Sequence, residues 1–340
     1  MIKKKNILFF LYILTSISYY LFFKDTNYYW QSSDSVTYLE VGRVLYEEQL
    51  SGEYLVFLLN NNLLGMGLIG LISFVIMPDG LNSLLVALIN LGIFFYIIIY
   101  CEKIANNLNI KLKNIFYIIL FFNPLFISYT FSINKELIAC LILLIFLLKI
   151  LKSDRFYSFI FLIIIGYIIR DGLGLILLIT LLIMLFNINI LYFIVINNFF
   201  ANYAIRENAL LAFSGDDSYS IFNLNDIFIW MQNNYLYFLV VPIKFIATIL
   251  SALPLRSGMP ESDNILGYLY LINSLVMIIL LFRIKKLFTL KFNLNLRKIL
   301  IFLCVYVSIM LLPPFINLRY LIPIYPLIFI ILLSNNEKNT

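Results

Sequence analysis

The chain has 340 residues, of which 63% are hydrophobic and 12% are charged, and its formal net charge is +6. A soluble domain carries charges on roughly a quarter of its residues, so this composition excludes an ordinary soluble fold and predicts a helical membrane protein. The sequence contains no histidine, which excludes Ser-His-Asp catalysis, Cys-His catalysis and metal sites built on histidine.

The first predicted helix covers residues 6–23 and follows Lys3, Lys4 and Lys5. A basic start before an apolar stretch is typical of a signal peptide. Here the apolar run continues to Phe23 and further apolar segments follow it. We therefore predict an uncleaved signal anchor whose N-terminus lies in the cytoplasm.

Apolar segments recur along the rest of the chain and predict an all-α bundle of about nine to eleven transmembrane spans. After the first helix, the predicted spans are residues 81–100, 115–131, 137–151, 156–169, 173–186, 265–282, 299–312 and 320–333. Two further stretches are ambiguous, because 55–77 contains asparagines and glycines and 235–254 contains two prolines and a lysine. The segment 188–200 is short for a span. We expect 55–77 to be re-entrant or interfacial, since asparagine amides in lipid need partners.

The basic residues are distributed unevenly between the loops. Sixteen of the 24 lysines and arginines, but three of the 18 acidic residues, fall in residues 1–5, 101–113, 149–155, 283–298 and the C-terminal tail. The positive-inside rule places these segments in the cytoplasm, which explains the net charge without a nucleic-acid partner. We expect one integral membrane domain over 1–340, with a first outer loop of interfacial helices at 24–80 and a second outer or partly re-entrant region at 201–264.

The first outer loop contains the candidate site residues Asp34, Tyr38 and Glu40. Asp34 and Tyr38 are four residues apart and therefore share one face of a helix. A carboxylate in this position is suited to take the proton from an attacking hydroxyl group. The alternative is an interfacial helix that Ser33 or Asp34 caps at its N-terminus.

The next candidates, Lys135 and Glu136, lie in a short link between two apolar segments, and Arg170 ends a third. Pro124, in the first of these segments, is expected to kink its helix. An ionisable group near the membrane core costs about 2.5–3.5 kcal/mol, so each is a candidate functional residue. The alternatives are an interfacial turn in which Lys135 snorkels and a local ion pair between Arg170 and Asp171.

The last candidates, Arg319 and Tyr320, lie among prolines near the C-terminal end of the chain. Proline has no backbone N–H group, so few main-chain donors are left for an anion in this segment. The planar guanidinium of Arg319 is therefore predicted to bind phosphate. Arg256, in the second outer region, is a further candidate for substrate binding.

Together these residues place carboxylates in the first outer loop and cations near the ends of spans. A carboxylate can act as a general base, and cations can neutralise a leaving diphosphate. The residues that carry a resemblance to known proteins are Asp34-Ser-x-x-Tyr38, Asn123-Pro124, Lys135-Glu136, Arg170 and Asn317-Leu-Arg319-Tyr320. In these motifs the chain resembles the membrane glycosyltransferases with a GT-C-type fold and the O-antigen polymerases of bacterial surface-polysaccharide synthesis.

The resemblance implies a GT-C-like bundle in the bacterial inner membrane, a polyprenyl-linked sugar donor, and chemistry on the periplasmic face. It implies that Asp34 is the base or a metal-associated carboxylate. The function expected first is an O-antigen polymerase that joins undecaprenyl-diphosphate-linked repeat units for lipopolysaccharide. The alternatives are a GT-C enzyme that adds one sugar from an undecaprenyl-phosphate carrier, a flippase or transporter of lipid-linked oligosaccharide, and a purely structural subunit.

The expected site combines catalytic and substrate-binding residues. The catalytic candidates are Asp34, Glu40 and Glu136, and the substrate-binding candidates are Tyr38, Lys135, Arg170, Arg256, Arg319 and Tyr320. No cofactor and no set of metal ligands are expected, and a divalent metal stays an option. The expected partners are undecaprenyl-linked saccharides, membrane lipid, and a chain-length regulator and a flippase of the same pathway.

Overall fold

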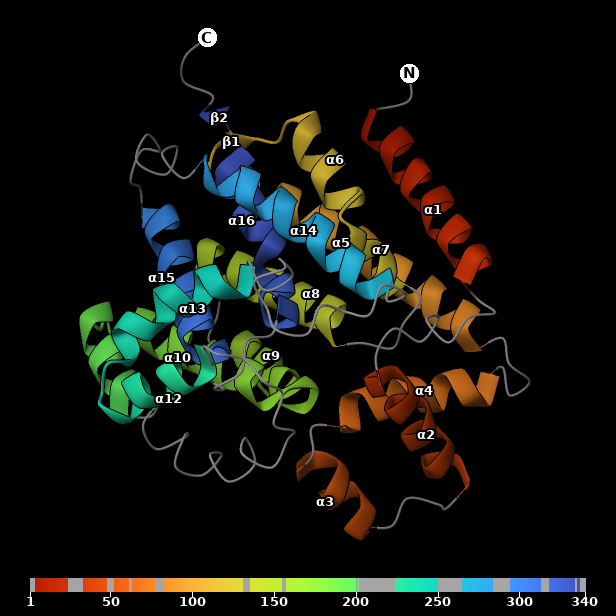
Figure 1. Ribbon diagram of the computed structural model, residues 1–340, viewed down its shortest axis with the longest axis horizontal. Coiled ribbons are helices and arrows are strands. Elements are labelled where there is room, and N and C mark those ends of the chain that lie inside the picture. The colour runs from red at the N-terminus through yellow and green to blue at the C-terminus, as the bar shows by residue number, and fades with distance from the viewer. Residues whose placement is uncertain are drawn as a thin grey trace. The chain divides into compact units, whose positions relative to one another are not determined.

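The computed structural model describes most of the chain as helices (Figure 1). The described residues are 4–23, 33–47, 52–60, 63–76, 82–130, 135–154, 157–199, 201, 224–249, 265–283, 294–312, 318–333 and 335–336. The prediction of an all-α fold is confirmed for these residues. The exception is a pair of two-residue strands, β1 (Ile110–Lys111) and β2 (Asn335–Asn336), which pair in antiparallel fashion.

The chain divides into two compact units. The first unit consists of residues 1–177, 283–291 and 322–340, and the second consists of residues 178–282 and 292–321. The helices of the first unit are α1 (Lys4–Phe23), α2 (Ser33–Glu47), α3 (Gly52–Asn60), α4 (Leu64–Ile76), α5 (Asn82–Asn107), α6 (Asn114–Phe121), α7 (Pro124–Thr130), α8 (Glu136–Lys152), α9 (Tyr157–Ile169) and α16 (Tyr325–Leu333).

The second unit contains most of the helix α10 (Asp171–Leu185), whose first residues belong to the first unit. Its other helical segments are residues 190–199, α12 (Leu224–Asn233), α13 (Tyr237–Ile249), α14 (Ile265–Leu281), α15 (Leu294–Met310) and the start of the 3-10 helix η2 (Leu318–Ile324). Pro323 lies inside η2, and α16 follows it directly.

The core of the first unit forms where α5 contacts α7, α8 and α16. Buried polar side chains fix these contacts by satisfying main-chain groups at the end of α7. Asn90 on α5 donates to the carbonyl oxygens of Tyr129 and Thr130, at 3.1 and 3.0 Å. The buried Tyr12 hydroxyl of α1 lies 2.5 Å from the Thr130 hydroxyl.

The segment 115–131 is interrupted where the sequence predicts a kink. Helix α6 ends at Phe121 and α7 begins at Pro124, which cannot donate a helical hydrogen bond. The Asn123 side chain accepts hydrogen bonds from the backbone N–H groups of Leu125 and Phe126, at 3.0 and 3.4 Å. Asn123 therefore caps the new helix.

Helix lengths bear on the predicted membrane spans. Within the described residues, Val86–Asn107 is the one helix long and apolar enough to cross a membrane by its length and composition. The other apolar helices contain 10–17 residues, among them Tyr157–Ile169 and Tyr237–Ile249. The number of spans therefore stays a prediction.

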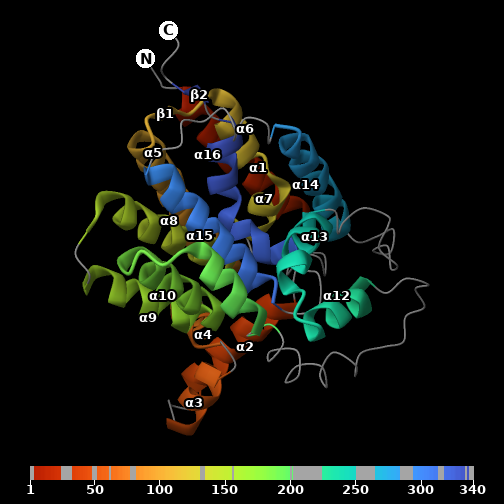
Figure 2. The ribbon, with the colours of Figure 1, turned by 90° about the vertical axis from the view of Figure 1, so that its left-hand side faces the viewer.

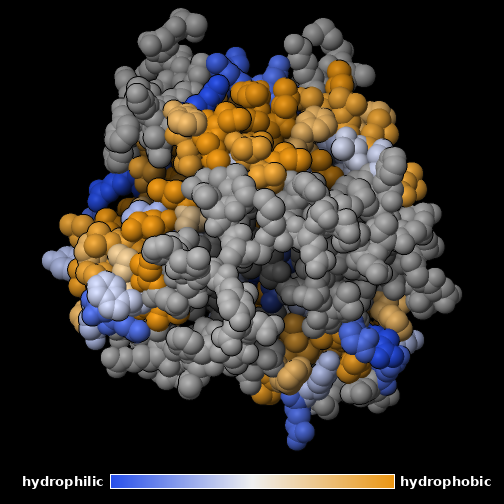
Figure 3. Space-filling model, viewed as in Figure 1, coloured by the Kyte–Doolittle hydropathy of each residue, from blue (hydrophilic) through white to orange (hydrophobic). Residues whose placement is uncertain are grey.

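Many large hydrophobic side chains are exposed on the described surface, as the orange atoms of Figure 3 show for one face. On α9 the exposed side chains include Ile160, Phe161, Ile164 and Tyr167. Water contact with such a surface is unfavourable, because burying apolar area contributes about 25 cal/mol per Å². Exposed apolar patches of this kind mark a surface that contacts lipid or another protein.

Candidate functional site

Four of the predicted site residues come together in the first unit, namely Tyr38, Lys135, Glu136 and Arg170. We call these four residues the charged cluster. They come from α2, from the start of α8 and from the turn between α9 and α10. The exposure of each of the four is low, at 4% for Tyr38, 8% for Lys135, 2% for Glu136 and 13% for the Arg170 side chain.

The start of α8 carries two members of the charged cluster. Lys135 is the N-cap residue of α8, and its carbonyl oxygen accepts a hydrogen bond from the backbone N–H of Ala139 at 2.8 Å. Glu136 is in the first turn, where a negative charge interacts favourably with the helix dipole. The Lys135 ammonium nitrogen lies 5.3 Å from the centre of the Tyr38 ring, within the range of a cation–π interaction.

Arg170, in the turn between α9 and α10, contacts Glu136 at the start of α8. Its Nη2 atom donates to Oε1 of Glu136 at 3.1 Å, and the two side chains are 13% and 2% exposed. An ion pair in such low exposure is screened little by solvent. Two cations and one carboxylate give the charged cluster a net positive charge.

The tight turn between α9 and α10 fixes the position of Arg170 (Figure 2). The Arg170 N–H donates to the Gly166 carbonyl at 2.9 Å, and the Arg170 carbonyl accepts from the N–H groups of Leu173 and Gly174 at 2.8 and 3.2 Å. A Cβ atom on Gly174 would lie 2.8 Å from the Tyr167 backbone nitrogen. Glycine at position 174 therefore lets the two helices meet directly beside Arg170.

Tyr38 is placed by a close crossing of α2 and α4. A Cβ atom on Gly70 would lie 2.4 Å from the Tyr38 carbonyl oxygen, and one on Gly42 would lie 2.4 Å from the Gly70 carbonyl carbon. The two backbones are therefore in contact, an arrangement that small residues allow between helices. The Tyr38 side chain is 4% exposed and packs against Val86 of α5.

The other candidates on α2 differ from Tyr38. Asp34 lies one helical turn before Tyr38, and its side chain is outside the described part of the structure. Glu40 is exposed and forms an ion pair with Arg43, whose guanidinium hydrogen bond holds the pKa of the Glu40 carboxyl below its usual value. Positions 34 and 40 are about 120° apart around a helix of 3.6 residues per turn, so Glu40 does not share the face of Asp34.

The remaining candidates belong to the second unit. Arg319 lies in η2 with its side chain outside the described part, and Arg256 lies outside the described residues altogether. The carbonyl oxygen of Tyr320 accepts a hydrogen bond from the hydroxyl of Tyr306, at 2.8 Å. This bond ties η2 to α15.

A polar group that the sequence analysis missed surrounds the end of α15. Buried Lys244 of α13 donates to the Leu311 carbonyl at 2.7 Å, and Gln232 of α12 donates to the Leu312 carbonyl at 3.2 Å. The signal in the sequence was a lysine within the apolar segment 235–254 together with the two prolines that follow Leu312. Prolines have no N–H group, so carbonyls at the end of α15 require side-chain donors.

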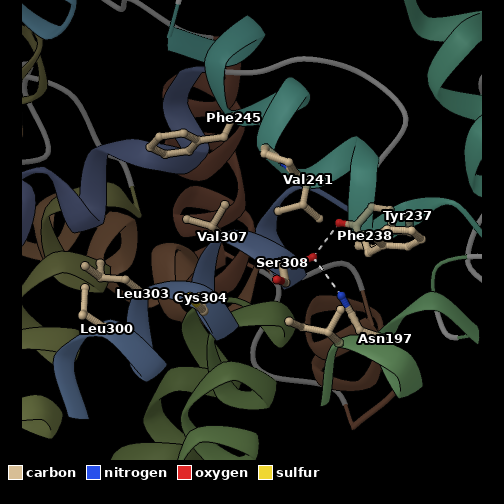
Figure 4. A pocket seen from close by; sticks show the side chains of 12 residues that line it. Asn197, Tyr237, Phe238, Val241, Phe245, Leu300, Leu303, Cys304, Val307 and Ser308 are labelled. Carbon is tan, nitrogen blue, oxygen red and sulfur yellow. Dashed lines mark hydrogen bonds between the residues drawn. The ribbon is translucent and has the colours of Figure 1, made fainter. Parts of the chain in front are cut away.

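An apolar pocket of about 310 Å³ lies beside this group, between residues 190–199, α13 and α15 (Figure 4). Two polar side chains in its wall, Tyr237 and Asn197, point to the Ser308 carbonyl, with donor distances of 2.5 and 3.5 Å. The rest of the wall is mainly hydrocarbon, and none of the predicted catalytic residues lines it. The charged cluster is therefore the better candidate for chemistry.

The charged cluster contains a lysine and an arginine, two side chains that bind anions through charge-assisted hydrogen bonds. Within the described residues, no group of three or more Asp, Glu, His or Cys side chains is placed to hold a metal ion. Comparisons with models of protein families, with curated proteins and with solved structures find no match for this chain.

Proposed function

We propose that the chain is a multi-pass membrane glycosyltransferase that joins undecaprenyl-diphosphate-linked repeat units on the periplasmic face of the bacterial inner membrane. The observation that carries the proposal is the charged cluster: a lysine, an arginine and a carboxylate gathered from two segments of a chain that is 63% hydrophobic. Charged groups inside apolar surroundings are expensive, so their convergence indicates a functional site.

In this proposal Asp34 is the general base. The acceptor sugar hydroxyl gives its proton to Asp34 while its oxygen forms a bond to the anomeric carbon of the donor. The bond between that carbon and the diphosphate oxygen breaks, and the diphosphate leaves on its lipid carrier. Lys135 and Arg170 are the cations that would stabilise the departing charge. The sequence-based prediction that Arg319 binds the donor diphosphate is kept as a separate part of the proposal.

The sequence predicts Glu136 as a catalytic candidate, and the proposal gives it a different role. Its carboxylate is 2% exposed and engaged by Arg170, so it is suited to orient the guanidinium. A carboxylate that holds an arginine in place leaves the planar donor fork aimed at the substrate. Asp34 then stays as the base, and Glu136 supports the cation that binds phosphate.

Two acids of α2, Asp34 and Glu40, give a direct test of which carboxylate is the base. We expect Asp34→Asn to abolish polymer, because the amide keeps the shape but cannot accept the proton. Glu40→Gln is the matched control, since it makes the same change on an exposed, ion-paired carboxylate of the same helix, and it should keep nearly full polymer. Polymer is measured by gel electrophoresis of surface polysaccharide, with the variant's level in the membrane determined in parallel.

The outcome that contradicts this role is full polymer from Asp34→Asn. The lipid intermediates in the inactive variant also separate the polymerase from the single-sugar enzyme. A lost polymerase leaves complete single repeat units on the lipid, whereas a lost single-sugar transferase leaves units that lack one sugar.

The proposed orientation predicts opposite labelling of two exposed positions. In a Cys304→Ser background, Glu47→Cys on α2 should react with a membrane-impermeant maleimide in intact spheroplasts. Lys152→Cys at the end of α8 should react only after the cells are opened, because its loop belongs to the basic set. Cys101 and Cys140 are buried and contribute little background. Labelling of Lys152→Cys in intact spheroplasts would overturn the orientation.

A further inference from the structure

The end of α15 is held by side chains from other helices of the second unit. Four carbonyl groups at a helix C-terminus lack helical partners, and a following proline removes the next backbone donors. Pro313 and Pro314 follow Leu312 in the sequence. The carbonyls of Ser308, Leu311 and Leu312 instead accept hydrogen bonds from side chains.

Among these donors Lys244 is the one with an amine group. It is 0% exposed, and its Nζ atom lies 2.7 Å from the Leu311 carbonyl oxygen and 5.9 Å from the centre of the Phe228 ring. This bond gives the Leu311 carbonyl a donor at a place where the following prolines supply no N–H group. Lys244 therefore helps to hold the chain at Leu311.

The backbone of η2 is also bonded to α15. Tyr306 of α15 donates from its hydroxyl to the Tyr320 carbonyl at 2.8 Å. Lys244 therefore fixes the chain at Leu311, and Tyr306 fixes it again at Tyr320. Arg319 lies next to the second fixed point.

We propose that Lys244 is a positioning residue, which holds the end of α15 and thereby helps to hold the backbone of η2 at Arg319. The hold on the end of α15 and on η2 does not depend on which reaction the protein catalyses. The consequence for catalysis rests on the proposed function, in which Arg319 binds the donor diphosphate. Lys244 itself does not contact the substrate.

The test measures how firmly η2 is held. Leu318→Cys, in a Cys304→Ser background, reports the accessibility of η2 to a maleimide in protein purified in detergent, where membrane sidedness plays no part. We expect Lys244→Met to raise the labelling rate about tenfold, because methionine keeps the apolar stem but removes the hydrogen-bond donor. Lys244→Arg keeps a hydrogen-bond donor, so its labelling rate should be close to that of the parent protein.

Tyr237→Phe is the matched control for loss of a donor in the same group. Its acceptor, the Ser308 carbonyl, also receives a bond from Asn197, so the labelling rate should stay near the parent value. If Lys244→Met does not accumulate, Lys244→Gln replaces it, since glutamine is polar but too short to reach Leu311. An unchanged labelling rate in either accumulated variant overturns the positioning role.

Polymer formation in the same variants separates this inference from the proposed function. Faster labelling with loss of polymer in Lys244→Met supports the whole proposal if Lys244→Arg shows labelling and polymer like those of the parent protein. Faster labelling with normal polymer keeps the hold on α15 but removes the part of the proposal in which Arg319 must be positioned. A failure of the glycosyltransferase assignment leaves the labelling result unaffected.

Discussion

Arg170→Met is expected to lower the free energy of unfolding by about 3–5 kcal/mol, because it removes the cation that pairs with the buried Glu136 carboxylate. The two side chains are 13% and 2% exposed, so solvent cannot replace the lost charge. The measurement is the thermal unfolding midpoint of the purified protein in detergent. Arg43→Met is the control, since the Arg43–Glu40 pair is 46% and 55% exposed and should contribute little to stability.

The double variant Glu136→Leu with Arg170→Met separates stability from function. Two apolar side chains of similar size often replace a buried ion pair without loss of stability, so the unfolding midpoint should recover most of its parent value. Polymer should stay absent, because the guanidinium that would bind phosphate has been removed. A double variant that recovers both stability and polymer would show that the pair is only structural.

Sequence periodicity and helix-breaking residues predict much of this fold. The predicted segments 137–151 and 156–169 become α8 (Glu136–Lys152) and α9 (Tyr157–Ile169). The expected irregularity of 55–77 appears as two helices, with α3 ending at Asn60 and α4 beginning at Leu64. These features follow from local chemistry, since asparagine and proline act on their immediate neighbours.

Pairing between distant side chains could not be predicted in the same way. Arg170 is adjacent to Asp171 in the sequence, and local pairing was a reasonable alternative, yet its guanidinium bonds Glu136, 34 positions away. Lys244 was noted only as an interruption of an apolar segment, because its acceptor is the Leu311 carbonyl on another helix. Such contacts depend on how the helices cross, which hydrophobic patterning in one sequence does not specify.

Substitutions at the crossing of α2 and α4 are also expected to have a large effect on polymer formation. We expect Gly42→Val and Gly70→Val to separate the two helices and to abolish polymer. A Cβ atom at either position would lie 2.4 Å from backbone atoms of the other helix, and backbone cannot move aside as a flexible side chain can. Overpacking typically costs about 1–3 kcal/mol, and a branched side chain at a backbone contact adds further clashes.

The alanine variants distinguish this contact from a general intolerance of glycine replacement. Gly92→Ala, on α5, meets nothing within 4 Å and should be neutral or more stable by up to about 1 kcal/mol, because alanine favours the helix. Gly70→Ala should instead lower the unfolding midpoint, and it should reduce polymer by displacing Tyr38 from its position beneath the Lys135 ammonium group. If Gly70→Ala and Gly92→Ala behave alike in both assays, the α2–α4 contact does not position the charged cluster. A loss of stability in Gly70→Ala with polymer retained would mean that the crossing supports the fold but that Tyr38 is not needed for the reaction.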